Sequence, residues 1–142
     1  MKMNYYCLVA ACLLLLAGCM HPDHPIRTRY QPNGFSGGYE EKLVSDNTYK
    51  VKFCKNGFTD PNDAYSSLLF RCLEIADGDN KEYIVIKRHG RLFFPVDNVY
   101  ATIELLNTPT DDFFEYSTEE LHKQLKPWMQ HNGLRRKTRG VK

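Results

Sequence analysis

The five cysteines are the residues of this chain with the widest range of chemistry, because a thiol can be acylated, oxidised to a disulfide or used as a nucleophile. Cys7 and Cys12 lie in an apolar run near the start of the chain, and Cys19 ends that run. Cys54 and Cys72 come much later, among polar and apolar residues that alternate. The segment around each cysteine therefore decides which reaction is open to its thiol.

Residues 1–18 have the organisation of an export signal. Lys2 supplies a positive charge, and Cys7 to Ala17 form an apolar stretch of signal-peptide length. A permanent membrane span would need about 20 apolar residues. The sequence L-A-G-C at residues 16–19 resembles the lipobox of bacterial lipoproteins, in which small residues precede a cysteine that accepts a diacylglyceryl group. We expect cleavage before Cys19 and its acylation by fatty acids such as palmitate. The alternatives are an ordinary secretory signal with a chance cysteine and a short membrane anchor.

Lipid on Cys19 would hold the mature chain at a membrane of the bacterial envelope, facing the periplasm, because several acyl chains together make a stable anchor. Met20 stands where enteric-type sorting uses Asp to retain a lipoprotein in the inner membrane. The sequence therefore favours the outer membrane. Export argues against nucleic acid as a partner, and the net charge of +2 gives no support for one.

Cys54 and Cys72 are the two thiols left once the signal is removed and Cys19 is acylated. The exported compartment is oxidising, and an even pair of cysteines in a small exported domain favours a disulfide. Such a bridge would stabilise the fold by about 3 kcal/mol. The alternative is a pair of reduced, buried thiols. We predict that the two cysteines are paired. The weak point of this prediction is strand alternation, which places Cys54 on the face opposite to the apolar Phe53 unless the strand bulges.

Three histidines are the remaining candidates for chemistry. His89 lies in a basic stretch from Arg88 to Arg91, where it could act as a general base if a partner oriented it. His21 and His24 flank an aspartate and could ligate a metal. A solvated turn is the favoured explanation of His89, and the chain lacks the G-x-S-x-G sequence of a nucleophile elbow. We expect no catalytic residues, no metal and no cofactor.

The chain beyond residue 18 divides into three parts by composition. Residues 19–38 are rich in proline and glycine and predict a flexible tether that follows the lipidated cysteine. Residues 39–130 have the periodicity of a folded domain. Residues 131–142 form a basic tail, in which five of the last eight residues are Lys or Arg. This tail could contact an anionic surface or be a solvated end.

Hydrophobic periodicity in residues 39–130 predicts a β-β-α-β-β-α order. The expected strands are Tyr39–Val44, Thr48–Cys54, Glu82–Lys87 and Val96–Leu106, and the loop Asn107–Phe114 follows the last strand. One helix is expected from Pro61 to about Ala76. A second is capped by Ser117 and ends near Lys126, before Pro127. This order predicts an α+β fold, a small and mostly antiparallel sheet with its helices packed on one face and its other face wet.

Part of the domain resembles a known family. Gly37-Gly38-Tyr39, the strand from Asn47 to Phe53 and the turn from Asn56 to Thr59 are similar to a group of small bacterial lipoproteins of unknown function. Their pattern is G-G-Y, followed by N-x-Y-x-V-x-F-x-G-N-G-x-T. The resemblance covers about residues 37–128, and the chain departs from the pattern at Lys55, which replaces a glycine. It implies an envelope address and an architecture, and it implies no catalytic residues.

These observations predict a membrane-anchored envelope lipoprotein. We expect the domain to be a non-enzymatic binding or structural-support module, with an unknown envelope protein or surface component as its partner. The alternative is a metal-binding or hydrolytic envelope protein that uses His89 or the pair His21 and His24.

Overall fold

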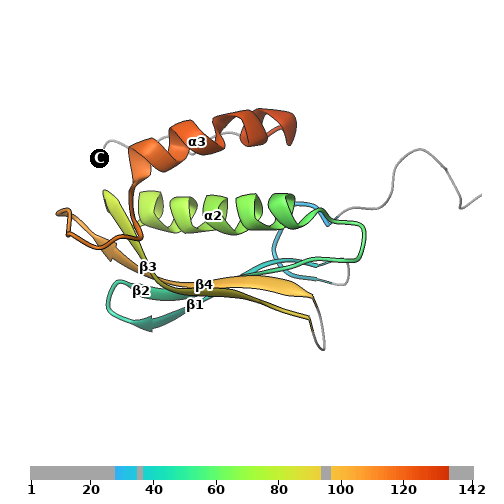
Figure 1. Cartoon of the computed structure of the whole chain (residues 1–142), viewed down its shortest axis with the longest axis horizontal. Helices are drawn as coiled ribbons and strands as arrows, with labels where there is room; N and C mark the ends of the chain where they lie inside the picture. Colours follow the sequence, from blue (N-terminus) through green and yellow to red (C-terminus); the bar gives the residue numbers. More distant parts are fainter. Residues whose placement is uncertain (1–27, 35–36, 94–96, 135–142) are drawn as a thin grey trace, which may run out of the picture.

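The computed structural model describes residues 28–34, 37–93 and 97–134 of the chain. These residues form a five-stranded antiparallel sheet with both helices on the same side of it: α2 packs on the sheet, and α3 packs on α2 and contacts β5 (Figure 1). The strands follow each other across the sheet in the order β1-β2-β4-β3-β5. The α+β fold predicted from the sequence is confirmed.

The first two strands form the predicted hairpin. β1 (Gly38–Ser45) pairs with β2 (Thr48–Cys54), and Asn47 in the turn between them has a φ of 61°. Asparagine tolerates this left-handed conformation better than most residues. β2 also pairs with β4 (Asn98–Leu106), which is the central strand of the sheet.

β3 (Tyr83–Leu92) continues through the residues that we expected to form a basic turn. A bulge between Ile86 and Arg88 shifts its register against β4, and the strand then runs on past Gly90. The ring of Tyr100 on β4 covers Gly90, since a Cβ placed there would lie 2.7 Å from the tyrosine hydroxyl oxygen. An aromatic ring over a strand glycine restores the packing that the missing side chain loses. This explains why Gly90 does not end the strand.

The helix α2 (Pro61–Gly78) lies directly on the sheet. The Asp60 carboxylate caps it by accepting from the Asn62 amide at 2.7 Å, and Pro61 occupies the first turn, as expected. The short strand β5 (Glu115–Ser117), which the sequence did not reveal, pairs with the start of β3 and leads into the second helix.

The helix α3 (Thr118–His131) begins as predicted and ends later than predicted. The Ser117 hydroxyl caps it by accepting from the Glu120 amide at 3.1 Å. The expected end before Pro127 is wrong, because Pro127 lies inside the helix. A proline within a helix costs about 3 kcal/mol. The turn after it packs Met129, which is 4% exposed, and the half-buried Trp128 into the core, and burial of these two side chains offsets that cost.

Residues 28–34 pack against the domain, although the sequence predicted that they belong to a flexible tether. The Tyr39 amide donates to the Gln31 carbonyl at 2.8 Å, and the Asn33 amide donates to the Tyr39 carbonyl at 2.7 Å. The Tyr30 ring packs on Tyr39 and Phe70 with centroid distances of 4.9 Å. The folded unit therefore includes residues that we had assigned to a flexible segment.

The hydrophobic core lies between the sheet and the two helices. It takes the alternate residues of the strands that face the helices and the inner face of each helix. Its fully buried large side chains are Val51, Phe53, Leu73, Ile84, Val99, Ile103, Leu105 and Leu121. Within the described residues, no helix is both long enough and apolar enough to span a bilayer.

Candidate binding surface

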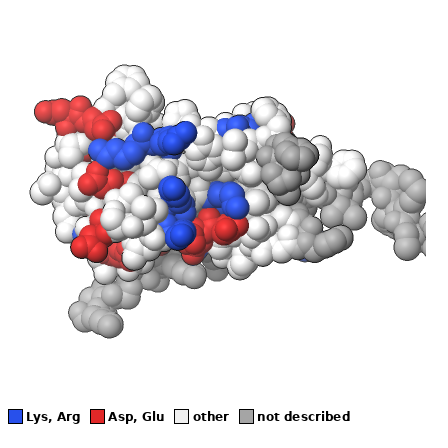
Figure 2. Space-filling view, turned by 90° about the horizontal axis from the view of Figure 1, so that it is seen from below, with Lys and Arg blue, Asp and Glu red and all other residues white. Residues whose placement is uncertain are grey.

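The face of the sheet that the helices leave uncovered carries most of its polar side chains. Figure 2 shows this face from below, with lysines and arginines close to acidic side chains. The register places Lys42 opposite Lys50, Lys50 opposite Thr102, and Thr102 opposite Arg88. Residues that are directly opposite across strands point to the same face. We call Lys42, Lys50, Thr102 and Arg88 the basic row.

The three cations of the basic row are exposed. No carboxylate of the described part of the chain forms an ion pair with any of them. Lys42 and Lys50 face each other across β1 and β2, and like charges in that position are destabilising. The row is therefore an uncompensated positive patch that crosses four strands.

A second row lies beside the first and has balanced charge. Lys52 pairs with Glu40 at 2.9 Å, and the register continues to Tyr100 and Gly90. The hydrogen bond between Lys52 and Glu40 raises the pKa of the lysine and lowers the pKa of the glutamate. Both side chains are well exposed, so this pair contributes little to stability.

The two rows line a shallow groove of about 460 Å³. Its lining consists of Glu40, Glu41, Lys42, Lys50, Val51, Lys52, Arg88, Leu92, Asn98, Tyr100, Ala101 and Thr102. Amines, a guanidinium, a phenol and a threonine hydroxyl can bind carboxylates or other anions by charge-assisted hydrogen bonds. The lining has no histidine or cysteine that could act as base or nucleophile. The groove therefore offers hydrogen-bond donors for an anionic group, beside the carboxylates of Glu40 and Glu41.

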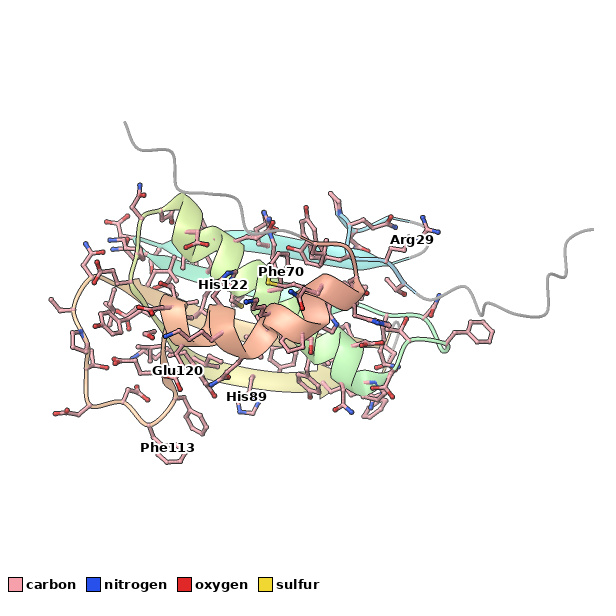
Figure 3. All side chains as sticks on the ribbon, turned by 90° about the horizontal axis from the view of Figure 1, so that it is seen from above. Arg29, Phe70, His89, Phe113, Glu120 and His122 are labelled. Carbon is pink, nitrogen blue, oxygen red and sulfur yellow. The ribbon has the colours of Figure 1, made fainter. Side chains whose placement is uncertain are left out.

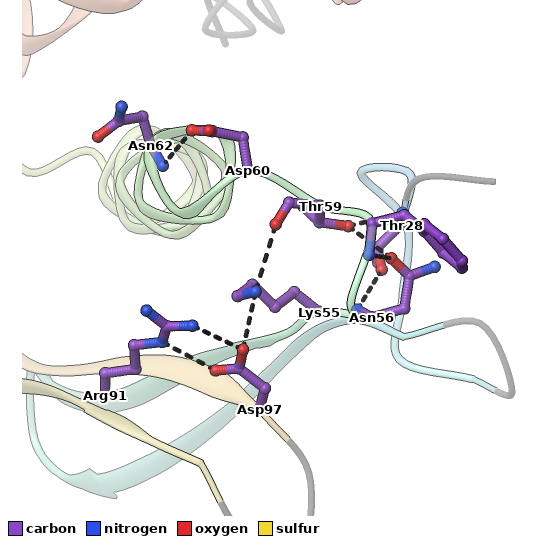
Figure 4. Close-up of polar contacts among 9 residues, drawn as sticks. Thr28, Lys55, Asn56, Thr59, Asp60, Asn62, Arg91 and Asp97 are labelled. Carbon is purple, nitrogen blue, oxygen red and sulfur yellow. Dashed lines mark hydrogen bonds and ion pairs between the residues drawn. The ribbon is translucent and has the colours of Figure 1, made fainter. Parts of the chain in front are cut away.

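A second polar cluster closes one end of the sheet (Figure 4). The Lys55 side chain is only 5% exposed, and its Nζ pairs with Asp97 at 2.7 Å and donates to the Thr59 carbonyl at 3.2 Å. Arg91 donates to both Asp97 oxygens, from Nε at 2.9 Å and from Nη2 at 2.7 Å. The bonds from Arg91, with a further contribution from Lys55, lower the pKa of Asp97 to about 2. This cluster, in which Lys55 and Arg91 share the Asp97 carboxylate, ties the β2–α2 loop to β3 and to the start of β4.

The same end receives the first described residues of the chain. The Thr28 amide donates to the Thr59 hydroxyl at 2.9 Å, and the Thr28 hydroxyl accepts from the Asn56 amide at 2.9 Å. The Asn56 side chain accepts from the Thr59 hydroxyl at 2.9 Å. The turn from Asn56 to Thr59, part of the stretch that resembles small bacterial lipoproteins, therefore holds Thr28 against the domain.

Cys54 and Cys72 are free thiols in the structure, so the Cys54–Cys72 disulfide that we considered is not formed. The reason is the alternation along β2. Cys54 lies on the uncovered face, where the charges of Lys52 and Glu40 act on it, whereas Cys72 lies on α2 and is fully buried in the core. Burial raises the pKa of both thiols, that of Cys72 to about 12. In the structure the two thiols are therefore unpaired, as in the alternative to the disulfide.

His89 lies on β3, exposed, with its ring 5.9 Å from that of Phe114. The structure brings no other histidine, cysteine or acid to it in an arrangement for metal binding, since the described residues contain no group of three such side chains. Cys19, His21 and His24 lie outside the described residues, as does the basic tail from residue 135 onward.

Sequence reasoning missed the basic row, because its members come from four strands that are not all consecutive. Lysines at alternate positions of a strand show which residues share a face. They do not show that Arg88, after a bulge, shares a row with Lys50. The register between β2, β4 and β3 creates the patch.

No protein-family model, no curated protein and no solved structure matches the chain. Function is therefore inferred from the residues of the chain and their placement.

Proposed function

We propose that the protein is a membrane-anchored bacterial envelope lipoprotein whose domain is a non-enzymatic binding module. The sequence L-A-G-C at residues 16–19 supports the anchor on Cys19. The uncovered sheet face supports the binding role, and its basic row is the contact surface for an anionic partner in the envelope. Acidic segments of an envelope protein and anionic surface components both have the required charge.

The observation that carries this proposal is the uncompensated charge of the basic row. Several other cations of the described residues have carboxylate partners. Arg71 pairs with Glu41 at 2.6 Å and with Glu74 at 2.7 Å, and Lys55 and Arg91 share Asp97. Lys42 and Lys50 instead repel each other at a cost of a few tenths of a kcal/mol to about 1 kcal/mol. Anionic groups of a partner would remove this repulsion, so binding gains from it.

Site-specific photocrosslinking in intact cells tests the binding surface. A photoreactive residue at Thr102, in the middle of the basic row, is expected to capture one envelope component. The same residue at Gln124, exposed on α3, is the positional control. Lys50→Glu should greatly reduce the adduct at residue 102. Lys126→Glu makes the same charge change on α3 and should leave the adduct intact.

Two results would contradict the binding role. One is a failure of residue 102 to form any adduct that residue 124 does not form. The other is an adduct at residue 102 that is equally abundant in the Lys50→Glu and Lys126→Glu chains.

The anchor is tested separately. Cys19→Ala should abolish fatty-acid labelling of the chain and remove it from the membrane fraction or leave it as an uncleaved precursor. Unchanged labelling and unchanged detergent partitioning would reject the anchor.

A further inference from the structure

We propose that the end of the domain bearing Phe58, Leu92 and Phe93 rests on the lipid surface, with its aromatic rings at the boundary between headgroups and acyl chains. This inference rests on the proposed lipid anchor at Cys19. It adds an orientation and a second membrane contact, made by the folded domain itself.

The first observation is the grouping of exposed apolar side chains. Phe58 is 67% exposed, Phe93 is 71% exposed and Leu92 is 51% exposed. Phe58 lies in the loop from β2 to α2, and the other two lie where β3 ends. Figure 1 shows that the β2–α2 loop and the end of β3 lie at the same end of the molecule. Single exposed apolar residues are common, whereas several at one end indicate an interaction surface.

The second observation is that the matched polar cluster holds this end rigid. Lys55 and Arg91 share Asp97, which ties the β2–α2 loop to β3 and to the start of β4. The guanidinium of Arg91 lies 4.4 Å from the centre of the Phe93 ring. The Phe58 amide donates to the Asn56 side chain at 3.1 Å. The rings are therefore presented from a fixed base, and little order is lost when they bind.

The third observation is the place where the chain enters the domain. Thr28 is nine positions after Cys19 and is hydrogen-bonded to Asn56 and Thr59 in the β2–α2 loop. Even fully extended, a segment of this length spans at most about 30 Å. An acylated Cys19 would therefore keep this end of the domain within about 30 Å of the bilayer surface.

The charge around the apolar side chains suits an anionic membrane. Arg29 is exposed at this end of the molecule (Figure 3) and follows Thr28 directly. Basic residues next to an interfacial apolar group bind anionic headgroups. Asp60 is exposed near Phe58 in sequence, and its carboxylate is engaged as the cap of α2. Apolar rings with an adjacent cation are the chemistry that recognises a lipid surface.

Phe113 is a matched control for these side chains. It is 90% exposed and lies toward the end opposite to Arg29 (Figure 3). Among the aromatic contacts of the described residues, its ring makes one, an edge-on contact with Phe114 at a centroid distance of 5.1 Å. A general tendency of exposed phenylalanines to touch lipid would involve Phe113 as much as Phe58. A defined orientation would spare it.

Depth-dependent fluorescence quenching tests the orientation. The acylated full chain is reconstituted into vesicles of phosphatidylethanolamine and phosphatidylglycerol, with or without lipids that carry brominated acyl chains. Phe58→Trp, Phe93→Trp and Phe113→Trp are compared after subtraction of the signal of the parent chain, which contains Trp128. Circular dichroism confirms that each variant is folded. We expect bromine to quench residues 58 and 93 at least about twofold more than residue 113, because interfacial groups sit about 5–10 Å into the headgroup and acyl boundary.

The outcomes separate the two proposals. A chain that does not float with the vesicles would overturn the lipid anchor, and the orientation with it. A chain that floats and shows equal quenching at residues 58, 93 and 113 would overturn the orientation alone. Indoles at residues 58 and 93 that are shielded from acrylamide in cell envelopes, yet not quenched by brominated lipid, would indicate a protein contact at this end and would also overturn it.

Discussion

Asp97→Asn is the substitution with the clearest expected effect on stability. It removes the carboxylate that pairs with Lys55 at 2.7 Å and with Arg91 at 2.7 Å. The Lys55 side chain is 5% exposed, so its ammonium group would stay buried with the Thr59 carbonyl and one amide oxygen as partners. Breaking a fully buried pair costs about 3–5 kcal/mol. Because Asp97 itself is 24% exposed, we expect a loss of about 2–3 kcal/mol.

Urea unfolding of the chain from residue 20 onward, followed by circular dichroism, measures this loss. Glu119→Gln is the matched control, since Glu119 pairs with Lys123 at 2.8 Å but both side chains are more than two-thirds exposed. That pair should contribute less than about 0.5 kcal/mol. The double variant Lys55→Met/Asp97→Asn should recover about 1 kcal/mol relative to Asp97→Asn, because the stranded cation is gone. Equal stabilities of Asp97→Asn and Glu119→Gln would refute the reasoning.

The pH dependence gives an independent check. The pKa of Asp97 is lowered to about 2 in the folded protein, by Arg91 first and Lys55 second. A carboxyl with a depressed folded-state pKa contributes stability above its unfolded pKa of about 4 and loses it as the pH falls toward about 2. The shift corresponds to at most about 2.5 kcal/mol, and solvent screening reduces this to about 1–2 kcal/mol. The stability difference between the parent chain and Asp97→Asn should therefore shrink between about pH 4 and pH 2.

Three further expectations follow from the packing. In urea unfolding, Gly38→Ala should lower the free energy of unfolding by at least about 2 kcal/mol, because the φ of Gly38 is +137° and a Cβ would lie 2.3 Å from the Gln31 carbonyl oxygen. Gly57 has open space around it, so Gly57→Ala should lower the free energy of unfolding by less than about 1 kcal/mol. Tyr30→Ala should lower the free energy of unfolding by about 2–4 kcal/mol and change the fluorescence of Trp128, whose ring centroid is 6.4 Å from that of Tyr30. Tyr30→Phe loses only the hydrogen bond to Glu74, so it should lower the free energy of unfolding by about 1 kcal/mol. Thiol alkylation with mass detection should modify Cys54 and Cys72 only after unfolding, since burial raises the pKa of both; a mass that shows a disulfide in the native protein would contradict the free-thiol state.

Local patterns were enough to predict the elements that bury one face. Val51 and Phe53 alternate with lysines, and both side chains prove to be at most 1% exposed. Caps were also visible, since Asp60 before Pro61 and Ser117 before Glu120 begin the two helices as expected. These signals depend on neighbours within a few residues, so the sequence contains them directly.

Features that depend on distant contacts could not be predicted. Pro127 is a helix breaker by local rules, and only the core contacts of Trp128 and Met129 keep it inside α3. Gly90 indicates a turn by local rules, and the contact with the Tyr100 ring, which the sequence does not show, keeps it within β3. The basic row could be predicted only from the register of four strands. Whether a disulfide can form could be predicted only from the faces on which the two thiols lie.

The Gly37-Gly38-Tyr39 sequence acquires a physical meaning from the structure. Gly37 and Gly38 have φ values of +91° and +137°, and the backbone of Cys54 and of Gln31 approaches each of them where a side chain would otherwise be. Residues 31–33 then hydrogen-bond to the backbone of Tyr39 beside β1. The pair of glycines thus lets the entering chain cross the end of the hairpin and reach Thr59. These two glycines, which the sequence assigned to a flexible tether, therefore join residues 28–34 to the hairpin.

The two proposed contacts meet at Leu92, which lines the groove and also belongs to the apolar end, but the cations of the basic row lie farther along the sheet. Lys50 is four residues from Cys54, at the end of β2 from which the loop carrying Phe58 follows, and four strand residues span about 13 Å. The Debye length at physiological ionic strength is about 8 Å. If Phe58 and Phe93 rest on the bilayer, the basic row stands beyond the reach of most of its surface potential, on a face that runs away from the membrane. The cations of the row then remain available to a partner in the envelope instead of being neutralised by headgroups. This geometry separates the causes of salt sensitivity, because added salt should weaken partner binding at the row while the apolar contact at the membrane persists.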